Sequence, residues 1–166
     1  MGKDASFDIV SEVDYQEVDN AYQQASKELM QRYDLKGSGA QLEFDKQKKE
    51  FVLTAPSDFV GSQVKDVLNS KLVRRSIDLK AVKWSDPVAA SLGNVRFTGQ
   101  IVSGITEDLI KRINKDIKAQ KYKKVKTQIE GDKIRASSPS RDDLQEVIAF
   151  VKDKDYDIPL QFVNYR

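Results

Sequence analysis

Polar and apolar positions follow two different periods along this chain, and the order of these periods occurs twice. In residues 5–84, a segment of alternating polarity, typical of a half-buried strand, is followed by a segment of helical period, two more alternating segments, a second helical segment and a short apolar one. Residues 94–166 have the same order. The pattern therefore predicts an α+β fold of two βαββαβ units, each a four-stranded antiparallel sheet with two helices on one face.

In the first unit, residues 1–84, a strand of alternating polarity ends at a capping-box pattern formed by Asp14 and Glu17. The helix that starts there repeats apolar residues at helical spacing, and these are expected to face the sheet: Val18, Tyr22, Ala25 and Leu29. The remaining elements are expected to be strands over 41–44 and 50–55 around a polar turn, a helix from Ser57 or Asp58, and a strand over 77–84.

The second unit, residues 94–166, repeats this order after a linker-like stretch at 85–93. A strand over 94–102 precedes a helix capped by Thr106, whose inward positions are predicted to be Ile110, Ile113 and Ile117. The remaining elements are expected to be a hairpin of strands 124–130 and 133–136 turning at Gly131-Asp132, a helix capped by Ser140, and a strand over 160–165.

Composition narrows the chemistry that this chain can perform. The 166 residues include no histidine and no cysteine, which removes Ser-His and Cys-His nucleophile pairs, disulfides and zinc-thiolate sites. No Walker-type phosphate loop is present, and Lys36-Gly37-Ser38-Gly39 is better interpreted as the turn after a helix. We therefore predict a protein that is not an enzyme and needs no cofactor or metal. A chain without cysteine is expected in the cytoplasm, and no apolar run is long enough to span a membrane.

Charge is concentrated in one part of the chain, although the net charge is only +2. Residues 111–126 contain eight basic side chains and one acidic side chain, Asp116. Lysines at 111, 115 and 118 lie opposite the apolar stripe of their helix, where a solvated face is the simplest interpretation. The group at 121–126 is less ordinary, because Lys124 and Lys126 are expected on one face of a strand.

An open sheet face is expected in each unit, because both helices cover the other face. The outward positions of the strands are polar, and they lack the aromatic signature with which an RNA-recognition motif stacks bases. A ligand held there would be bound by charge and shape. The side chains predicted to hold its phosphates are Arg96, Lys123, Lys124, Lys126, Lys133 and Arg135, with Arg135 suited to a bidentate contact.

Blocks of residues that reach both ends of the chain resemble the YajQ family of small bacterial proteins. They include Arg32-Tyr33-Asp34-Leu35-Lys36-Gly37-Ser38 and Pro159-Leu160-Gln161-Phe162-Val163-Asn164-Tyr165-Arg166, with further blocks at 6–13, 17–21, 70–80 and 141–145. The resemblance implies a tandem of two ferredoxin-like domains whose first strands, 6–13 and 94–102, are exchanged between the units. No residue-level site comes with it.

The resemblance also implies a function. Family members are described as nucleotide-binding proteins, some as cyclic di-GMP receptors, and RNA such as tRNA is a further proposed ligand. We therefore expect a non-enzymatic, cytosolic protein whose partner is a nucleotide or RNA, with a regulatory protein as a further possible partner. The alternative is a protein-interaction adaptor that uses the open sheet face without a nucleotide ligand. Salt dependence separates these two readings, because phosphate binding weakens steeply with salt.

Overall fold

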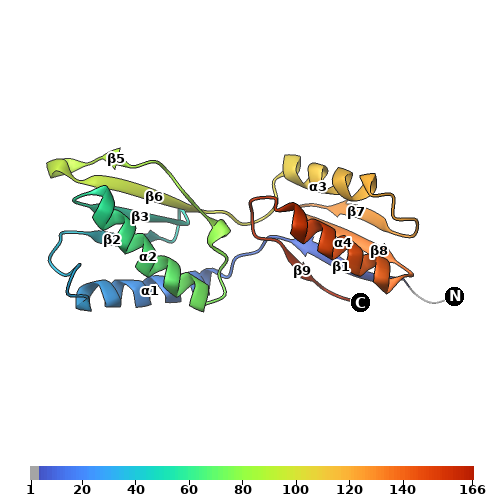
Figure 1. Cartoon of the computed structure of the whole chain (residues 1–166), viewed down its shortest axis with the longest axis horizontal. Coiled ribbons are helices and arrows are strands. Elements are labelled where there is room, and N and C mark those ends of the chain that lie inside the picture. Colours follow the sequence, from blue (N-terminus) through green and yellow to red (C-terminus); the bar gives the residue numbers. More distant parts are fainter. Residues whose placement is uncertain (1–3) are drawn as a thin grey trace. The chain divides into compact units, whose positions relative to one another are not determined.

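A computed structural model describes residues 4–166, and these residues form two compact units. Unit 1 consists of residues 4–12 together with 103–166, and unit 2 consists of residues 13–102. The chain therefore starts in unit 1, passes into unit 2 after residue 12, and returns to unit 1 after residue 102 (Figure 1). Both units combine one antiparallel sheet with two helices, as the doubled pattern predicts.

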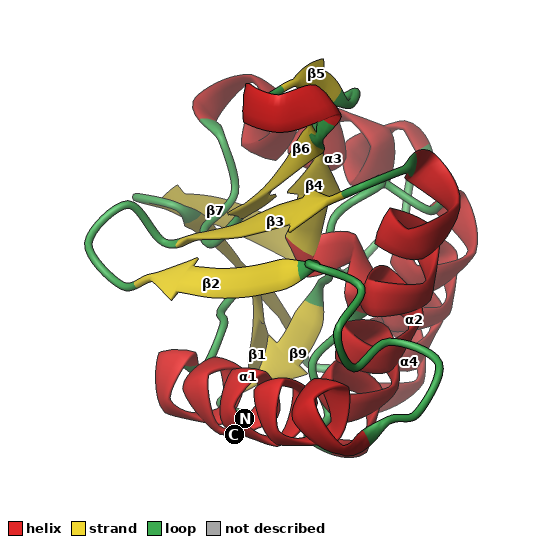
Figure 2. Ribbon diagram, turned by 90° about the vertical axis from the view of Figure 1, so that its left-hand side faces the viewer, coloured by secondary structure: helices red, strands yellow, loops and turns green. Residues whose placement is uncertain are grey.

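Unit 2 is built on an antiparallel sheet with the strand order β2-β3-β6-β4. Its strands are β2 (Gln41–Asp45), β3 (Glu50–Ala55), β6 (Val95–Ile101) and β4 (Val82–Trp84). The two-residue strand β5 (Val88–Ala89) pairs with the first two residues of β6. Helices α1 (Tyr15–Gln31) and α2 (Asp58–Arg74) cover one face of the sheet (Figure 2). Their apolar sides and the inner face of the sheet enclose the core of this unit.

Unit 1 has an antiparallel sheet with the order β7-β8-β1-β9. Its strands are β7 (Lys126–Glu130), β8 (Lys133–Ser138), β1 (Ala5–Val10) and β9 (Gln161–Val163). Helices α3 (Glu107–Ala119) and α4 (Arg141–Lys154) pack on one face, where isoleucine supplies much of the core. In Figure 1, α4 lies in front of the sheet and α3 lies above β7.

The first strand of each sequence repeat occupies the centre of a sheet. β1 lies between β8 and β9, which come from the second half of the chain, with Phe7 opposite Ala136 and Asp8 opposite Arg135. β6 lies between β3 and β4, which come from the first half, with Phe97 opposite Leu53. Each sheet therefore contains one strand from the other half of the sequence.

Within residues 4–166, the four α-helices begin at the residues that the sequence marks as caps. The Ser57, Thr106 and Ser140 hydroxyls each accept a hydrogen bond from a backbone N–H in the first turn of α2, α3 and α4. The Asp14 carboxylate accepts from the backbone of Gln16 and of Glu17 at the start of α1. These side chains satisfy N–H groups that have no partner within the helix, which explains why each helix starts at that point.

The predicted inward faces of the helices lie in the two cores. Val18 and Ala25 of α1 are fully buried, and so are three isoleucines of α3, Ile110, Ile113 and Ile117. Tyr22 and Leu29, at the edge of the α1 stripe, are only partly buried and pack against the same core. The helical period in the sequence thus identified the correct side of α1 and of α3.

Several boundaries differ from those expected. Residues 85–93 are not an extended linker: they contain β5 and a short 3-10 turn, and Ser85 exchanges hydrogen bonds with Thr98 of β6. The segment 77–84 is a strand only from Val82, because Asp78 caps the 3-10 turn η1 (Leu79–Ala81). β7 starts at Lys126, after a turn that includes Lys124, so the expected common strand face of these two lysines does not form.

Candidate functional site

The open face of the unit 1 sheet carries several of the side chains proposed to hold phosphate. The strand register places Lys126, Gln128 and Glu130 of β7 opposite Ser137, Arg135 and Lys133 of β8, on the face away from the helices. The residues between them, such as Ile134 and Ala136, point into the core. Arg135 is in turn opposite Asp8 of β1. Lys133, Arg135 and Asp8 therefore meet at the centre of this face.

Asp8 is buried at the centre of this face, with only 1 % of its surface exposed. Its carboxylate accepts hydrogen bonds from Arg135 Nε at 3.1 Å and from Asn164 Nδ2 at 2.8 Å. Lys133 Nζ lies 3.6 Å from the same carboxylate, and Arg135 Nη2 lies 3.5 Å from Glu130. Asp8 is thus a buried carboxylate on the open face, and it is retained there because cations and hydrogen-bond donors surround it.

Asn164 reaches Asp8 because the chain bulges after β9. Val163 is opposite Asp8, whereas Arg166 exchanges backbone hydrogen bonds with Ser6, so one extra residue is inserted on the outer strand. Asn164 lies at this bulge and has a φ of 56°, a conformation that asparagine tolerates better than most residues. The bulge directs its side-chain amide toward the buried carboxylate.

This network changes the electrostatics of Lys133 and Arg135. Burial raises the pKa of Asp8, but hydrogen bonds from Asn164 and Arg135 and the charges of Arg135 and Lys133 outweigh burial, so that its pKa lies below the ordinary value. The hydrogen bond to Asp8 likewise raises the pKa of Arg135. Both cations are thus compensated within the protein, and a phosphate at Arg135 would compete with Asp8 and Glu130.

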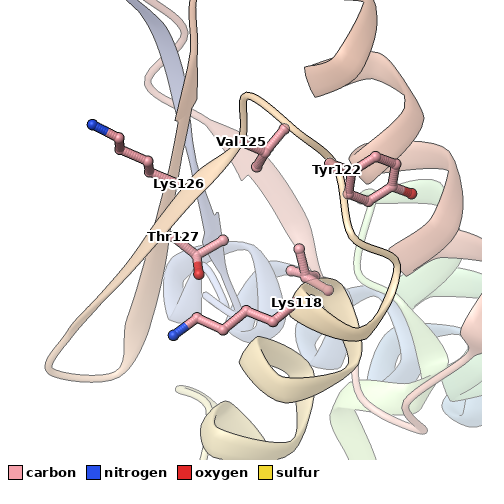
Figure 3. A pocket seen from close by; sticks show the side chains of 6 residues that line it. Lys118, Tyr122, Val125, Lys126 and Thr127 are labelled. Carbon is pink, nitrogen blue, oxygen red and sulfur yellow. The ribbon is translucent and has the colours of Figure 1, made fainter.

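A pocket of about 450 Å³ lies beside β7, the edge strand of this sheet, next to the last turn of α3. Its lining residues are Ile117, Lys118, Tyr122, Val125, Lys126 and Thr127. Figure 3 shows that Lys118 and Lys126 extend their ammonium groups toward the same side, whereas Tyr122 points in the opposite direction. The pocket thus has a cationic end and an aromatic end, and its volume is in the range that holds small-molecule ligands.

Two groups in the pocket can form hydrogen bonds with a ligand. Thr127 Oγ1 is buried and has no hydrogen-bond partner within the described residues. Buried hydroxyls are normally paired, so this oxygen is a specific position for a donor or acceptor from outside the chain. Burial, assisted by the negative charges of Glu146 and Asp143, raises the pKa of Tyr122, which keeps its phenol protonated and able to donate.

The other predicted cations are distributed unevenly. Lys123 and Lys124 lie in the exposed turn that leads into β7, close in sequence to the pocket. Within residues 4–166, neither they nor Lys118 and Lys126 take part in an ion pair. Arg96 is exposed on the open face of β6, which belongs to unit 2, so the two units divide the predicted set between them.

Sequence reasoning missed the pocket itself. The sequence pattern places Lys118 on a solvated helix face and gives no reason to select Tyr122 or Thr127. The available signal was the short segment between α3 and β7, which must carry the chain from the helix layer to the sheet edge with an aromatic residue in its middle. That signal does not specify a cavity, because the space depends on how α3 and β7 pack in three dimensions.

Other site types find no support in the part of the chain that the structure covers. No group of three or more acidic side chains among residues 4–166 is arranged to hold a metal ion. Among the helices described, none combines the length and the apolar character needed to cross a bilayer.

The fold and the pocket define a class of small α+β proteins with two antiparallel sheets, one of which has a basic edge. The chain belongs to the YajQ family, described as "Nucleotide-binding protein YajQ-like", which matches residues 5–166. It is 49 % identical over 163 residues to a nucleotide-binding protein of Nocardia farcinica, covering 98 % of this chain and 99 % of the relative. Proteins of the same name from Desulfitobacterium hafniense and Bacillus cereus are 46 % identical over the full length of both chains. The relatives are named for binding and not for a reaction.

Proposed function

We propose that this protein is a non-enzymatic nucleotide-binding protein and that the pocket beside β7 is its ligand site. The observation that carries the proposal is the coincidence of two uncompensated lysines, Lys118 and Lys126, with the unpaired buried hydroxyl of Thr127 in one pocket. Lysine ammonium groups bind phosphate, and a buried hydroxyl supplies a directional contact. The names of the relatives support the same class of ligand.

The charge distribution gives the ligand an orientation. Its phosphates lie at the end of the pocket formed by Lys118 and Lys126, where Lys123 and Lys124 of the adjacent turn add positive charge. The base lies against Tyr122, Val125 and Ile117, because the carboxylates near Tyr122 repel a phosphate at that end. Lys133 and Arg135 have a smaller part than the sequence suggests, since Asp8 already compensates them.

The finer identity of the ligand is a dinucleotide such as cyclic di-GMP, or RNA such as tRNA, in a cytoplasmic setting. Both carry phosphates at a spacing that several lysines can meet, and both present a base to the aromatic end. A dinucleotide would be held mainly by the pocket. RNA would extend along the basic turn and show the steeper dependence on salt, because it contacts more cations.

The decisive experiment is isothermal titration calorimetry with mono-, di- and cyclic dinucleotides and tRNA, comparing the parent with the double variant Lys118→Glu/Lys126→Glu. We expect at least a roughly hundred-fold loss of affinity, because two attractive charges become repulsive. The melting temperature should change little, since both side chains are at the surface. Lys124→Glu/Lys126→Glu should give a loss of similar size.

Three controls make the result specific. Lys48→Glu reverses an exposed charge in the hairpin turn of unit 2 and should leave binding unchanged. Lys133→Gln should have a small effect, because that ammonium group already faces Asp8. Thr127→Val removes only the hydroxyl and should weaken binding without lowering stability. Binding by the double variant as tight as by the parent at low salt would show that the site is elsewhere, and no binding of any nucleotide would favour the protein-interaction adaptor.

A further inference from the structure

A second pocket of unit 1 lies away from β7, between α4, β1 and the end of the chain after β9. It has a volume of about 120 Å³, and its lining residues are Ala5, Ser6, Phe7, Arg141, Leu144, Gln145, Ile148, Tyr165 and Arg166. Phe7, Leu144 and Ile148 are buried and form an apolar floor, whereas Arg141, Gln145 and Arg166 are exposed. The pocket thus has an apolar floor and a polar, positively charged rim.

One wall of this pocket is an exposed aromatic ring. Tyr165 is 61 % exposed, although its ring lies against the buried ring of Phe7 with the centroids 6.1 Å apart and the planes tilted by 34°. An aromatic side chain that is anchored on one side and open on the other is a surface on which a planar ring can stack. The backbone pairing of Arg166 with Ser6 fixes the segment that presents Tyr165.

The charges of the rim are not compensated. Neither Arg141 nor Arg166 takes part in an ion pair within residues 4–166, and no acidic side chain lines the pocket. Arg135, in contrast, is held by two carboxylates. A guanidinium group can bind a phosphate through two parallel hydrogen bonds and can also stack on a base. Ser6 and Gln145 add groups that donate and accept hydrogen bonds at the edge of a ring.

The size of the pocket restricts what can enter it. Pockets that enclose a whole small molecule usually exceed about 300 Å³, so a cavity of about 120 Å³ admits one ring and leaves the rest of the ligand at the rim. For a nucleotide, this places the base on the apolar floor beside Tyr165 and the phosphate at the two arginines.

We propose that this pocket is a second binding site for one nucleotide unit, with the base stacked on Tyr165 and the phosphate bound by Arg141 and Arg166. The bound nucleotide is either a free mononucleotide or one residue of a single-stranded RNA, which share this chemistry. The inference takes the class of ligand from the proposed function but uses none of the residues beside β7. The protein therefore holds nucleotides at two separate places in unit 1.

The test is a titration of the isotope-labelled full chain with AMP, and separately with a short single-stranded oligoadenylate, followed by two-dimensional NMR. We expect saturable shift changes of backbone amides at residues 5–7, 141–148 and 165–166, in addition to those at 117–127. An oligoadenylate in which the bases are removed should fail to shift the amides near Tyr165. Tighter binding of oligoadenylate than of AMP at this site would identify single-stranded RNA as the ligand. Equal binding of the two would identify a free mononucleotide as the ligand.

Variants then test the residues directly. Tyr165→Leu and the double variant Arg141→Gln/Arg166→Gln should each weaken binding at this site roughly ten-fold, whereas Tyr165→Phe retains the ring and should bind like the parent. Lys154→Gln, a loss of one exposed charge at the end of α4, is the matched control and should have no effect.

The outcomes separate the two proposals. Shift changes confined to 117–127 overturn the second site and leave the proposed function intact. Changes confined to the surroundings of Arg141 and Tyr165 support the second site and show that the pocket beside β7 does not bind adenine nucleotides. The absence of shifts anywhere with either probe overturns the second site, whereas the pocket beside β7 is decided by the calorimetry with dinucleotides and tRNA. Equal binding by Tyr165→Leu and the parent also overturns the second site, even if its amides shift.

Discussion

The two sheets place chemically different pairs at the same position. In unit 2 the central strands β3 and β6 pair Leu53 with Phe97 on the core side and Val52 with Thr98 on the open side. In unit 1 the central strands β8 and β1 pair Ala136 with Phe7 on the core side and Arg135 with Asp8 on the open side. A neutral pair in one sheet is thus replaced by a buried ion pair in the other. The repeat conserves the core and varies the open face.

The difference shows which cations remain for a ligand. Asp8 compensates Arg135 and Lys133 at the centre of the unit 1 sheet, where an open face would otherwise have been the natural phosphate site. The uncompensated cations are at the periphery, beside the edge strand β7 and near the end of the chain. Local charge density in a sequence is therefore a poor guide to a site when a buried acid lies on the neighbouring strand.

The units also differ in how the chain builds them. Unit 2 is one continuous stretch, residues 13–102, whereas unit 1 is made from two pieces that this stretch separates. Folded unit 2 holds residues 13 and 102 within one compact body, which shortens the effective loop that unit 1 must close. The stability of unit 1 therefore depends on the folding of unit 2 more than the stability of unit 2 depends on the folding of unit 1.

The largest effect is expected from truncations in the two cores, which test this dependence. Ile113→Ala in unit 1 and Leu68→Ala in unit 2 each remove a fully buried side chain and should cost about 2–5 kcal/mol of unfolding free energy. Leu68→Ala should speed amide hydrogen exchange in both units, because unfolding of unit 2 opens the long loop within unit 1. Ile113→Ala should speed exchange mainly in unit 1, as followed by mass spectrometry of peptides from each unit.

Trp84, the only tryptophan of the chain, lies in unit 2 and gives an independent measurement. Its fluorescence transition in urea should shift with Leu68→Ala and stay close to that of the parent with Ile113→Ala. An equal shift with both variants would mean that the units unfold as a single cooperative body.

A smaller effect is expected when the central open-face pairs are broken. Asp8→Ala leaves Arg135 and Lys133 without their carboxylate and should cost about 2–4 kcal/mol, less than for a wholly buried pair because both cations are about one-third exposed. Thr98→Ala, at the corresponding position of unit 2, should cost less than about 1 kcal/mol. Urea denaturation of the two variants measures the difference, and equal costs would show that the ion pair is not important for stability.

The same pair predicts a dependence on pH. The lowered pKa of Asp8 stabilises the fold above the usual aspartate pKa of about 3.9, and this contribution is lost as the pH falls through the lowered value. Asp8→Asn keeps the shape of the side chain and lacks this contribution. The stability difference between the parent and Asp8→Asn should therefore be largest at neutral pH and shrink in acid, and a constant difference would exclude this linkage.

The smallest effect concerns the edge of the unit 2 core. Leu29 is only partly buried at the end of the α1 stripe, so Leu29→Ala should cost about 1–2 kcal/mol, less than the truncation of Ile113. Chemical denaturation of both variants under one set of conditions gives the ranking. A cost for Leu29 above that for Ile113 would mean that α1 packs more deeply than the structure shows.

The sequence alone determined the features that depend on neighbouring residues. The caps at Ser57, Thr106 and Ser140 start helices because a side-chain oxygen reaches an N–H only three residues away. The inward faces of α1 and α3 follow from helical period, and the hairpins from polar turns between alternating segments. The order of elements and the two antiparallel sheets were predictable for this reason.

Tertiary structure decided everything that depends on which strands become neighbours. The same pattern of alternating residues fits a central strand in either sheet, so periodicity does not tell that Asp8 meets Arg135 more than a hundred residues away. Nor does it tell that the chain bulges at Asn164 so that this side chain donates a hydrogen bond to Asp8, or that the hydroxyl oxygen of Thr127 is buried beside a cavity without a partner. Polar patterning specifies how much of a side chain can be exposed, whereas the identity of its partner is set only when distant segments pack together.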